Sequence, residues 1–187
     1  MEIILKKNPK NPIIIEGFPG FGLVGTITTE FLIDVLKAER IGSIRMKEAP
    51  PMVAIHQGNI VRPMGIYYDE KYNLVILHVM ANVANLEWDV ATELLKLAKT
   101  LDAKQIISIE GVGSPGLEGD PSSYYHSTDA TASKKFKDAG IKPLKEGIVM
   151  GVTATLLLQV DHDFPMSCIF AETHSNMPDS KASAKII

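Results

Sequence analysis

Continuous apolar runs rich in β-branched residues predict the buried strands of this chain. The first run is Ile13–Glu16, and residues 104–110, with three isoleucines, and 166–172 are predicted as two further buried strands. Such runs are typical of strands that are covered on both faces, as in a parallel sheet. A shorter run at 41–46 predicts a further strand.

The middle of the chain predicts an antiparallel meander. Residues 53–56, 61–68 and 74–79 each have strand character. The turns between them, at 57–59 and 69–73, are too short to hold a crossover helix. Consecutive strands joined in this way must be antiparallel.

Apolar residues at helical spacing predict the helices. One helix follows the first strand, with Leu23, Ile27, Phe31, Leu32, Val35 and Leu36 at that spacing. Another covers 86–101, with Leu86, Val90, Leu94, Leu97 and Leu101 on one face. Residues 129–139 predict a polar helix that ends at Gly140, and 151–160 predict a helix or a strand-to-helix corner. A last helix begins at Ser180, with Asp179 as its N-cap.

Strands and helices alternate along most of the chain, apart from the meander. This order predicts an α/β fold with three layers, α/β/α, and a mixed sheet. We expect a single domain over residues 1–187, because neither an internal repeat nor a long linker divides them. Residues 111–127, rich in Gly, Pro and Ser, are expected to form a loop.

Composition excludes several classes of protein. Hydrophobic residues make up 45% and charged residues 22%, so a core can form, and the net charge of −3 includes no basic stripe of the kind that nucleic-acid binders carry. The longest nearly uncharged stretch, Gly147–Val160, is too short to span a bilayer. The amino terminus does not resemble a signal peptide. We therefore expect a cytoplasmic protein that binds neither nucleic acid nor membrane.

A glycine-rich turn follows the first strand. Gly20-x-Gly22-x-x-Gly25 is the pattern that presents backbone N–H groups to the pyrophosphate of a dinucleotide. The acidic residue expected about 20 positions later is poorly matched by Glu48. Phe18 is expected at the surface together with Phe21, where they favour a protein contact over a phosphate cradle. The alternative to a dinucleotide site is a tight packing turn.

Three buried strands end in glutamate, at Glu16, Glu110 and Glu172. If the strands are parallel neighbours, these carboxylates could converge on a metal or form an acid–base pair. The alternative, which we favour, is that each accepts hydrogen bonds from its own loop or from a neighbouring helix start. His174 adds too few ligands for a metal site, and we expect neither metal nor cofactor.

Other chemically suggestive residues are weak candidates. Ser114 fails the nucleophile-elbow pattern because Val112 replaces the first glycine. Residues 161–163 are expected to form a polar turn. Cys168 lies within an apolar strand and is expected to be an inert core thiol, which also fits a reducing compartment. Trp88 could serve either the core or an interface.

Two distant segments together resemble a known family. Gly17–Gly25 is similar to the N-terminal glycine motif of the proteasome assembly chaperone family in its archaeal and bacterial form. Ala171–Ala184 is similar to that family's C-terminal signature, and Gly147–Leu158 to the segment that leads into it. The candidates for family-motif or partner-contact roles are Gly17, Phe18, Pro19, Gly20, Phe21, Gly22, Gly25, Glu172, Thr173, His174, Pro178 and Asp179.

The resemblance implies a fold similar to nucleoside phosphorylases, no recognised active site, homo-oligomers, and a role in assembling the proteasome α ring. It also implies further helices after the signature, so we expect this chain to be a C-terminally shortened form. It lacks the penultimate tyrosine with which some members enter pockets between α subunits.

Two functions follow from the sequence. The first is a non-catalytic, oligomeric protein-binding factor that acts on proteasome α subunits or another protein client. The alternative is a nucleotide- or nucleoside-binding enzyme that uses the glycine turn. Self-association is also expected from apolar residues in predicted loops and turns, namely Phe18, Phe21, Met52, Met64, Tyr124 and Tyr125.

Overall fold

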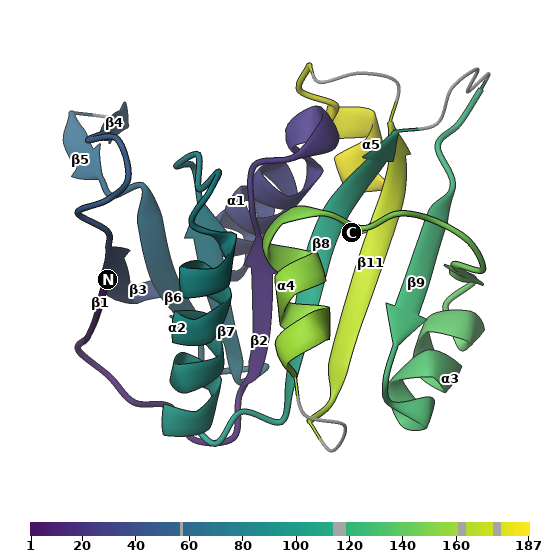
Figure 1. The fold of residues 1–187 in the computed structure, drawn as a ribbon, viewed down its shortest axis with the longest axis horizontal. Helices are drawn as coiled ribbons and strands as arrows, with labels where there is room; N and C mark the ends of the chain where they lie inside the picture. The colour runs from purple at the N-terminus through teal and green to yellow at the C-terminus, as the bar shows by residue number, and fades with distance from the viewer. Residues whose placement is uncertain (57, 114–118, 161–163, 174–176) are drawn as a thin grey trace.

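A large mixed sheet forms the centre of the molecule (Figure 1). The computed structural model describes residues 1–56, 58–113, 119–160, 164–173 and 177–187. Within that part of the chain the sheet has nine strands in the order β1-β3-β6-β7-β2-β8-β11-β9-β10. The bounds are β1 Glu2–Leu5, β2 Ile13–Gly17, β3 Glu39–Arg45, β6 Met64–Asp69, β7 Leu74–Val79, β8 Gln105–Gly113, β9 Ser123–Ser127, β10 Lys142–Pro143 and β11 Met166–Thr173.

The four central strands are parallel. β2 pairs in parallel with β7 on one side and β8 on the other, and β11 pairs in parallel with β8. Antiparallel strands continue the sheet on both sides, with β6 on β7 and β9 on β11. The carboxyl ends of the central strands therefore share one edge, where α/β proteins commonly bind ligands.

Helices cover both faces of the sheet, which confirms the predicted three-layer architecture. α2 (Glu87–Thr100) and α4 (Gly151–Gln159) lie in front of it in Figure 1, while α1 (Val24–Leu36) and α5 (Ser180–Ala184) lie behind. α3 (Ala130–Asp138) packs against β9 and β10 at one end. None of the helices within the described residues is long and apolar enough to cross a membrane.

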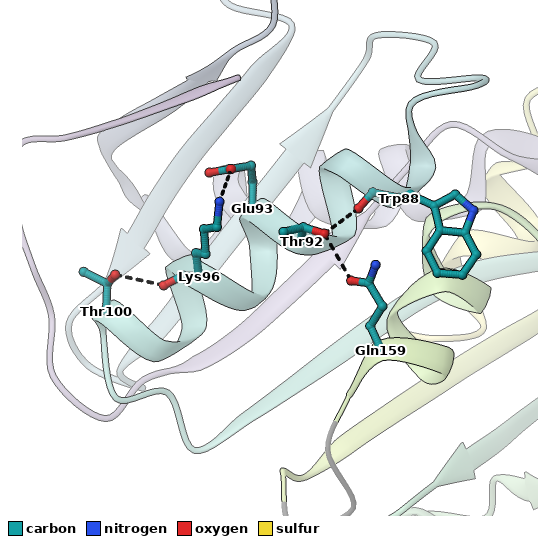
Figure 2. A network of polar contacts seen from close by, with 6 residues as sticks. All are labelled: Trp88, Thr92, Glu93, Lys96, Thr100 and Gln159. Carbon is teal, nitrogen blue, oxygen red and sulfur yellow. Dashed lines mark hydrogen bonds and ion pairs between the residues drawn. The ribbon is translucent and has the colours of Figure 1, made fainter.

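The main core lies between the sheet and the α2–α4 layer. Leu94 and Leu97 of α2 and Leu156 of α4 are buried there against the strands. The hydroxyl of Thr92 donates to Trp88 O at 2.8 Å and to Gln159 Oε1 at 3.4 Å, and the second bond joins the two helices (Figure 2). Trp88 itself is exposed, so it does not serve the core.

The apolar residues predicted at helical spacing on α1 do not form its buried face. The helix instead packs through small and polar residues, with Val24, Gly25, Thr28 and Thr29 buried. Thr29 Oγ1 donates to Gly25 O at 2.9 Å and lies 3.0 Å from His78 Nδ1. Close packing of this kind leaves Phe31 exposed, at 45% of its surface.

The antiparallel meander is confirmed, with one modification. Its first hairpin, β4 (Ala54–His56) with β5 (Asn59–Val61), forms a separate two-stranded sheet at one end of the molecule (Figure 1). Pro63 lies between β5 and β6 and divides the single strand expected at 61–68. Proline has no N–H group to donate to a ladder, so it commonly interrupts strand pairing.

Several sequence-based expectations were wrong in detail. The loop expected at 111–127 instead contains the end of β8 and all of β9, and β1 and β10 were missed. Phe18, Met64 and Tyr125 were expected to be exposed, but all three are buried. Phe18 retains only 4% of its surface because the chain turns it back over the sheet, whereas Phe21 retains 40%.

Three glycines permit the close approach of α1 to the sheet. A Cβ at Gly17 would collide with the backbone of Gly25, and a Cβ at Gly25 would collide with the carbonyl oxygen of Ile109. At Gly111 it would meet the carbonyl oxygen of Phe21. The obstacles are backbone atoms, which cannot rotate away as a side chain could. The glycine turn is thus accounted for by packing.

We predict that Gly25→Ala destabilises the fold. The added methyl group must displace either α1 or β8, and overpacking of this kind typically costs about 2 kcal/mol. The free energy of unfolding should be measured by denaturant titration. Gly113→Ala is the control, because its Cβ would lie 3.8 Å from the Phe21 ring, at ordinary contact distance. Equal stability of the two variants would contradict the packing interpretation.

Candidate functional site

The two segments that resemble the chaperone family meet in space. Asp179 donates its backbone N–H to Gly22 O at 2.9 Å, and Thr173 Oγ1 donates to Asp179 Oδ2 at 2.8 Å. Gly22 has φ +63°, and a Cβ there would lie 2.7 Å from Thr173 Oγ1. The carboxyl-terminal segment therefore packs directly on the glycine turn.

Asp179 also begins α5, as predicted. Its Oδ1 accepts from Ala182 N at 2.9 Å, which satisfies one of the N–H groups at the start of the helix. Ala182 is buried with Val24, Ile109 and Ala171 in a small second core. This core holds α5 against α1 and the back of the sheet.

The candidate motif residues divide into a buried and an exposed group. Gly17, Phe18, Gly22, Gly25 and Thr173 are buried, and Pro19, Glu172 and Asp179 are half-buried. Gly20, Phe21 and Pro178 are exposed. His174 lies outside the described residues, as do Ser114 and the predicted polar turn at 161–163.

A pocket opens at the shared carboxyl edge of the central strands. It has a volume of about 960 Å3. The glycine turn lines one side, from Phe18 to Phe21, and the segment from Pro143 to Val152 lines another. Glu110 and Glu172 also face it. This is the position that topology favours for a ligand in an α/β sheet.

The three strand-end glutamates lie on the same face of the sheet, beneath α4, but they do not converge. Alternate residues of β8 point to this face, among them Ser108 and Glu110. Glu16 pairs in register with Ser108 of β8, and Glu110 lies two residues further along β8. Glu172 of β11 pairs in register with Val112, two residues beyond Glu110 on β8. The carboxylates are thus staggered diagonally across the strands.

Glu16 is completely buried. Its Oε1 accepts a short hydrogen bond from the Ser108 hydroxyl, while Oε2 has no hydrogen-bond partner among the residues that the structure describes. Burial raises the pKa of Glu16 well above its ordinary value, and the neighbouring Glu110 carboxyl raises it further, against the opposing effect of Ser108. Glu16 is therefore held as a neutral acid in the core.

Glu110 lies between Glu16 and the pocket. Thr153, in the first turn of α4, donates to Glu110 Oε1 at 2.6 Å. Burial raises the pKa of Glu110 to about 7, and the Thr153 hydrogen bond opposes that shift. The carboxyl consequently changes its charge near neutral pH.

Glu172 is held by hydrogen bonds to its neighbours. It accepts the backbone N–H of Ser122 at 3.0 Å and the hydroxyl of Tyr124 at 3.1 Å. Glu110 accepts its hydrogen bond from the first turn of a helix, which agrees with the prediction that the strand-end carboxylates bond to their own loop or to a helix start. The two partners of Glu172 lie instead in β9 or directly before it.

Within the described part of the chain, the lining of the pocket includes no Ser, Cys or His side chain. Cys168 is buried in the core, where burial raises the pKa of its thiol and opposes thiolate formation. No group of three or more His, Cys, Asp and Glu side chains that could hold a metal ion occurs among the residues described. What the site does provide is a pocket with apolar walls and a titratable carboxyl.

Sequence reasoning missed two contributors to this site. Thr153 was not singled out, because a threonine within an apolar helix carries no chemical signal of its own. Tyr124 was named only as an exposed apolar residue in a loop, whereas it lies in β9 and donates to Glu172. Both roles depend on contacts between segments far apart in the chain.

We predict that the stability of the protein falls as pH rises from about 5 to about 8. Glu110 has a folded-state pKa above its unfolded value of about 4.5, so the stability that its neutral form contributes is present below that value and is lost as pH rises through about 7. Glu16 acts in the same direction. Glu110→Gln should remove the part of this pH dependence that Glu110 causes. Relative to the wild type, its free energy of unfolding should be higher by up to about 3 kcal/mol at pH 8, and the difference should shrink toward pH 5.

Chemical denaturation at several pH values measures this difference. Glu146→Gln, an exposed change on the rim of the same pocket, should follow the wild-type profile. If Glu110→Gln shows the same dependence on pH as the wild type, the neutral buried carboxyl is excluded.

Solved structures with the same fold include several archaeal proteins. PbaA of Pyrococcus furiosus, an archaeal homolog of proteasome-assembly chaperone, superposes with a TM-score of 0.88 at 28% identity over 99% of this chain and 81% of its own. PbaB of the same organism, an archaeal proteasome activator, gives 0.80 at 22% identity over 99% of this chain and 85% of its own. The fold prediction is thereby confirmed.

Sequence comparison leads to the same family. An uncharacterized protein of Methanocaldococcus jannaschii is 24% identical over 185 residues, which are 95% of this chain and 72% of that relative. The model of the PAC2 family matches residues 14–187. This family of proteasome assembly chaperones is non-enzymatic, so the enzyme alternative is set aside. The extent of the match and the shared fold together place this chain in the PAC2 family.

Proposed function

We propose that this chain is a self-associating, non-catalytic factor of the cytoplasm that binds proteasome α subunits or another protein client. Membership of the PAC2 family supports a proteasome-related role without catalysis. The similarity to PbaA, described as a homolog of proteasome-assembly chaperone, supports proteasome subunits as the proposed client.

The projecting β4–β5 hairpin supports self-association and carries the proposal. Ile55 and Ile60 are directly paired across its two strands, and both are exposed. Val53 and Met52, just before the hairpin, are exposed as well. Contiguous exposed apolar residues of this kind mark sites of protein association.

The exposed members of the two family motifs support a client contact. Phe21 and Pro178 lie in the segments that the Gly22–Asp179 contact joins, and both are accessible. The buried members of the motifs instead maintain that junction. Aromatic residues are enriched in protein interfaces, so Phe21 is the side chain that we propose for the contact.

We predict that the chain is an oligomer and that Ile55→Glu dissociates it. Burying a new carboxylate in an apolar interface is costly, so the mass measured by light scattering should fall toward 20.4 kDa. Leu158→Glu on α4 is the matched control, because Leu158 is 74% exposed and Ile55 is 75% exposed.

The two variants separate the possible outcomes. Dissociation by Leu158→Glu alone would place the interface on α4 and exclude the hairpin. A wild-type mass of 20.4 kDa at high micromolar concentration would refute self-association itself.

We predict that Phe21→Ser weakens the capture of proteasome α subunits by the immobilised chain. Loss of a central aromatic contact commonly lowers affinity by tenfold or more, through about 2 kcal/mol of binding energy. Phe31→Ser is the control, since Phe31 is a phenylalanine of similar exposure on α1. Undiminished capture by Phe21→Ser would remove the motif from the client interface, and no capture by the wild type would refute α subunits as the client.

A further inference from the structure

The pocket at the carboxyl edge of the sheet has a largely apolar lining. Its lining includes Phe18, Val83, Val152 and Phe170, all of which belong to the buried core. Ile148 and Met150 stand exposed at its rim. A volume of about 960 Å3 is at the upper end of the range for pockets that hold small organic ligands.

One polar atom in the lining of this pocket accepts no hydrogen bond from the part of the chain that the structure describes. Thr153 satisfies Oε1 of Glu110, but no hydrogen bond from any described residue reaches Oε2. A Cβ placed on Gly20 would lie 3.1 Å from that oxygen, so the absence of a side chain at Gly20 leaves space in front of it. A ligand that enters the pocket can therefore donate a hydrogen bond to Glu110 Oε2.

The charged side chains around the pocket favour a ligand of positive charge. Among the described residues its lining contains four carboxyl side chains, Glu87, Glu110, Glu146 and Glu172, and one cationic side chain, Lys145. A phosphate or carboxylate entering here would be repelled, whereas a cation would be attracted. An ammonium group is both cationic and a hydrogen-bond donor, which matches the unpartnered oxygen.

We propose that this pocket binds a small organic amine, with its ammonium group on Glu110 Oε2 and its apolar body against the buried aromatic walls. This assignment is independent of the proposed role in client binding. A lysine side chain of a partner protein carries the same ammonium group, but its slender alkyl chain would leave most of the pocket empty. The volume and the aromatic walls favour a ligand with a bulky apolar body.

Binding of such an amine is coupled to the ionisation of Glu110. Burial raises the pKa of this carboxyl to about 7, so an ammonium ion must bind the ionised form, which is the minor form below that pH. Affinity should therefore fall about tenfold from pH 8 to pH 6, while the amine itself stays protonated. Within the described residues, the titratable groups around Glu110 are Glu16 on β2, Cys168 and Glu172 on β11, Tyr124 on β9, Glu87 on α2, and Lys145 and Glu146 before α4.

The test compares three probes of matched size by calorimetry and ligand-observed NMR on the full chain. Phenethylamine carries the ammonium group, 2-phenylethanol is its neutral analogue, and 3-phenylpropanoate is its anionic analogue. We expect the amine to bind at least tenfold more tightly than the alcohol, and the carboxylate not to bind. A lysine-containing peptide is the fourth arm.

Two variants locate the binding at Glu110. Glu110→Gln should weaken the amine at least tenfold and abolish its dependence on pH. Gly20→Val keeps the carboxyl but fills the space before Oε2, and should also abolish binding. Glu146→Gln at the exposed rim should alter affinity by less than threefold. Circular dichroism confirms that each variant is folded.

The proposal is overturned by any of four results. These are no amine binding at 10 mM and pH 8, equal binding of the alcohol, unchanged amine affinity in Glu110→Gln, or tighter binding of the lysine peptide than of the amine. None of them bears on the capture of α subunits, so failure here leaves the proposed function standing.

Discussion

Contact between backbones, without intervening side chains, organises this molecule. Gly17, Gly25 and Gly111 let the start of α1 lie directly on β2 and β8. Because α1 is held so close, its buried side consists mostly of small and polar residues, while Phe31 and Val35 are exposed. The same approach places Gly22 where Thr173 and Asp179 can cover it. The position of α5, and one wall of the pocket, follow from that arrangement.

Two glutamates on the face of the sheet beneath α4 are energetically costly, Glu16, which is fully buried, and Glu110, which is half-buried. Glu16 and Glu110 occupy positions where apolar residues would be more stable, since a buried carboxyl must give up either its charge or part of its solvation. Each is partly satisfied by one hydroxyl, from Ser108 and Thr153 respectively. Polar residues kept at such cost commonly mark a binding site, because a ligand can supply the interactions that the fold leaves unmade.

The sequence predicted the features that depend on local pattern. The buried strands β2, β8 and β11 and the periodic leucines of α2 were placed correctly. Burial on both faces of a sheet, or on one face of a helix, requires apolar residues at positions that can be recognised in the sequence. The buried face of α1 could not be predicted, since backbone contact removes the need for large side chains there. β9 was missed because Ser123–Ser127 contains few apolar residues. It forms a strand through its antiparallel pairing with β11. The pocket could not be anticipated either, since its lining residues come from six separate segments of the chain.

The placement of β11 has a consequence for how the chain folds as it is made. This strand lies between β8 and β9, yet it follows every other strand of the sheet in the chain. Until the ribosome has released it, β8 and β9 have no partner between them, and the apolar edge of β8 stays open. Unpaired strand edges in nascent chains invite wrong associations. The glycine turn, which emerges among the first residues, must likewise wait for Thr173 and Asp179 before it is covered. The amino-terminal half can thus be made long before it is closed, and a cell must protect it during that interval.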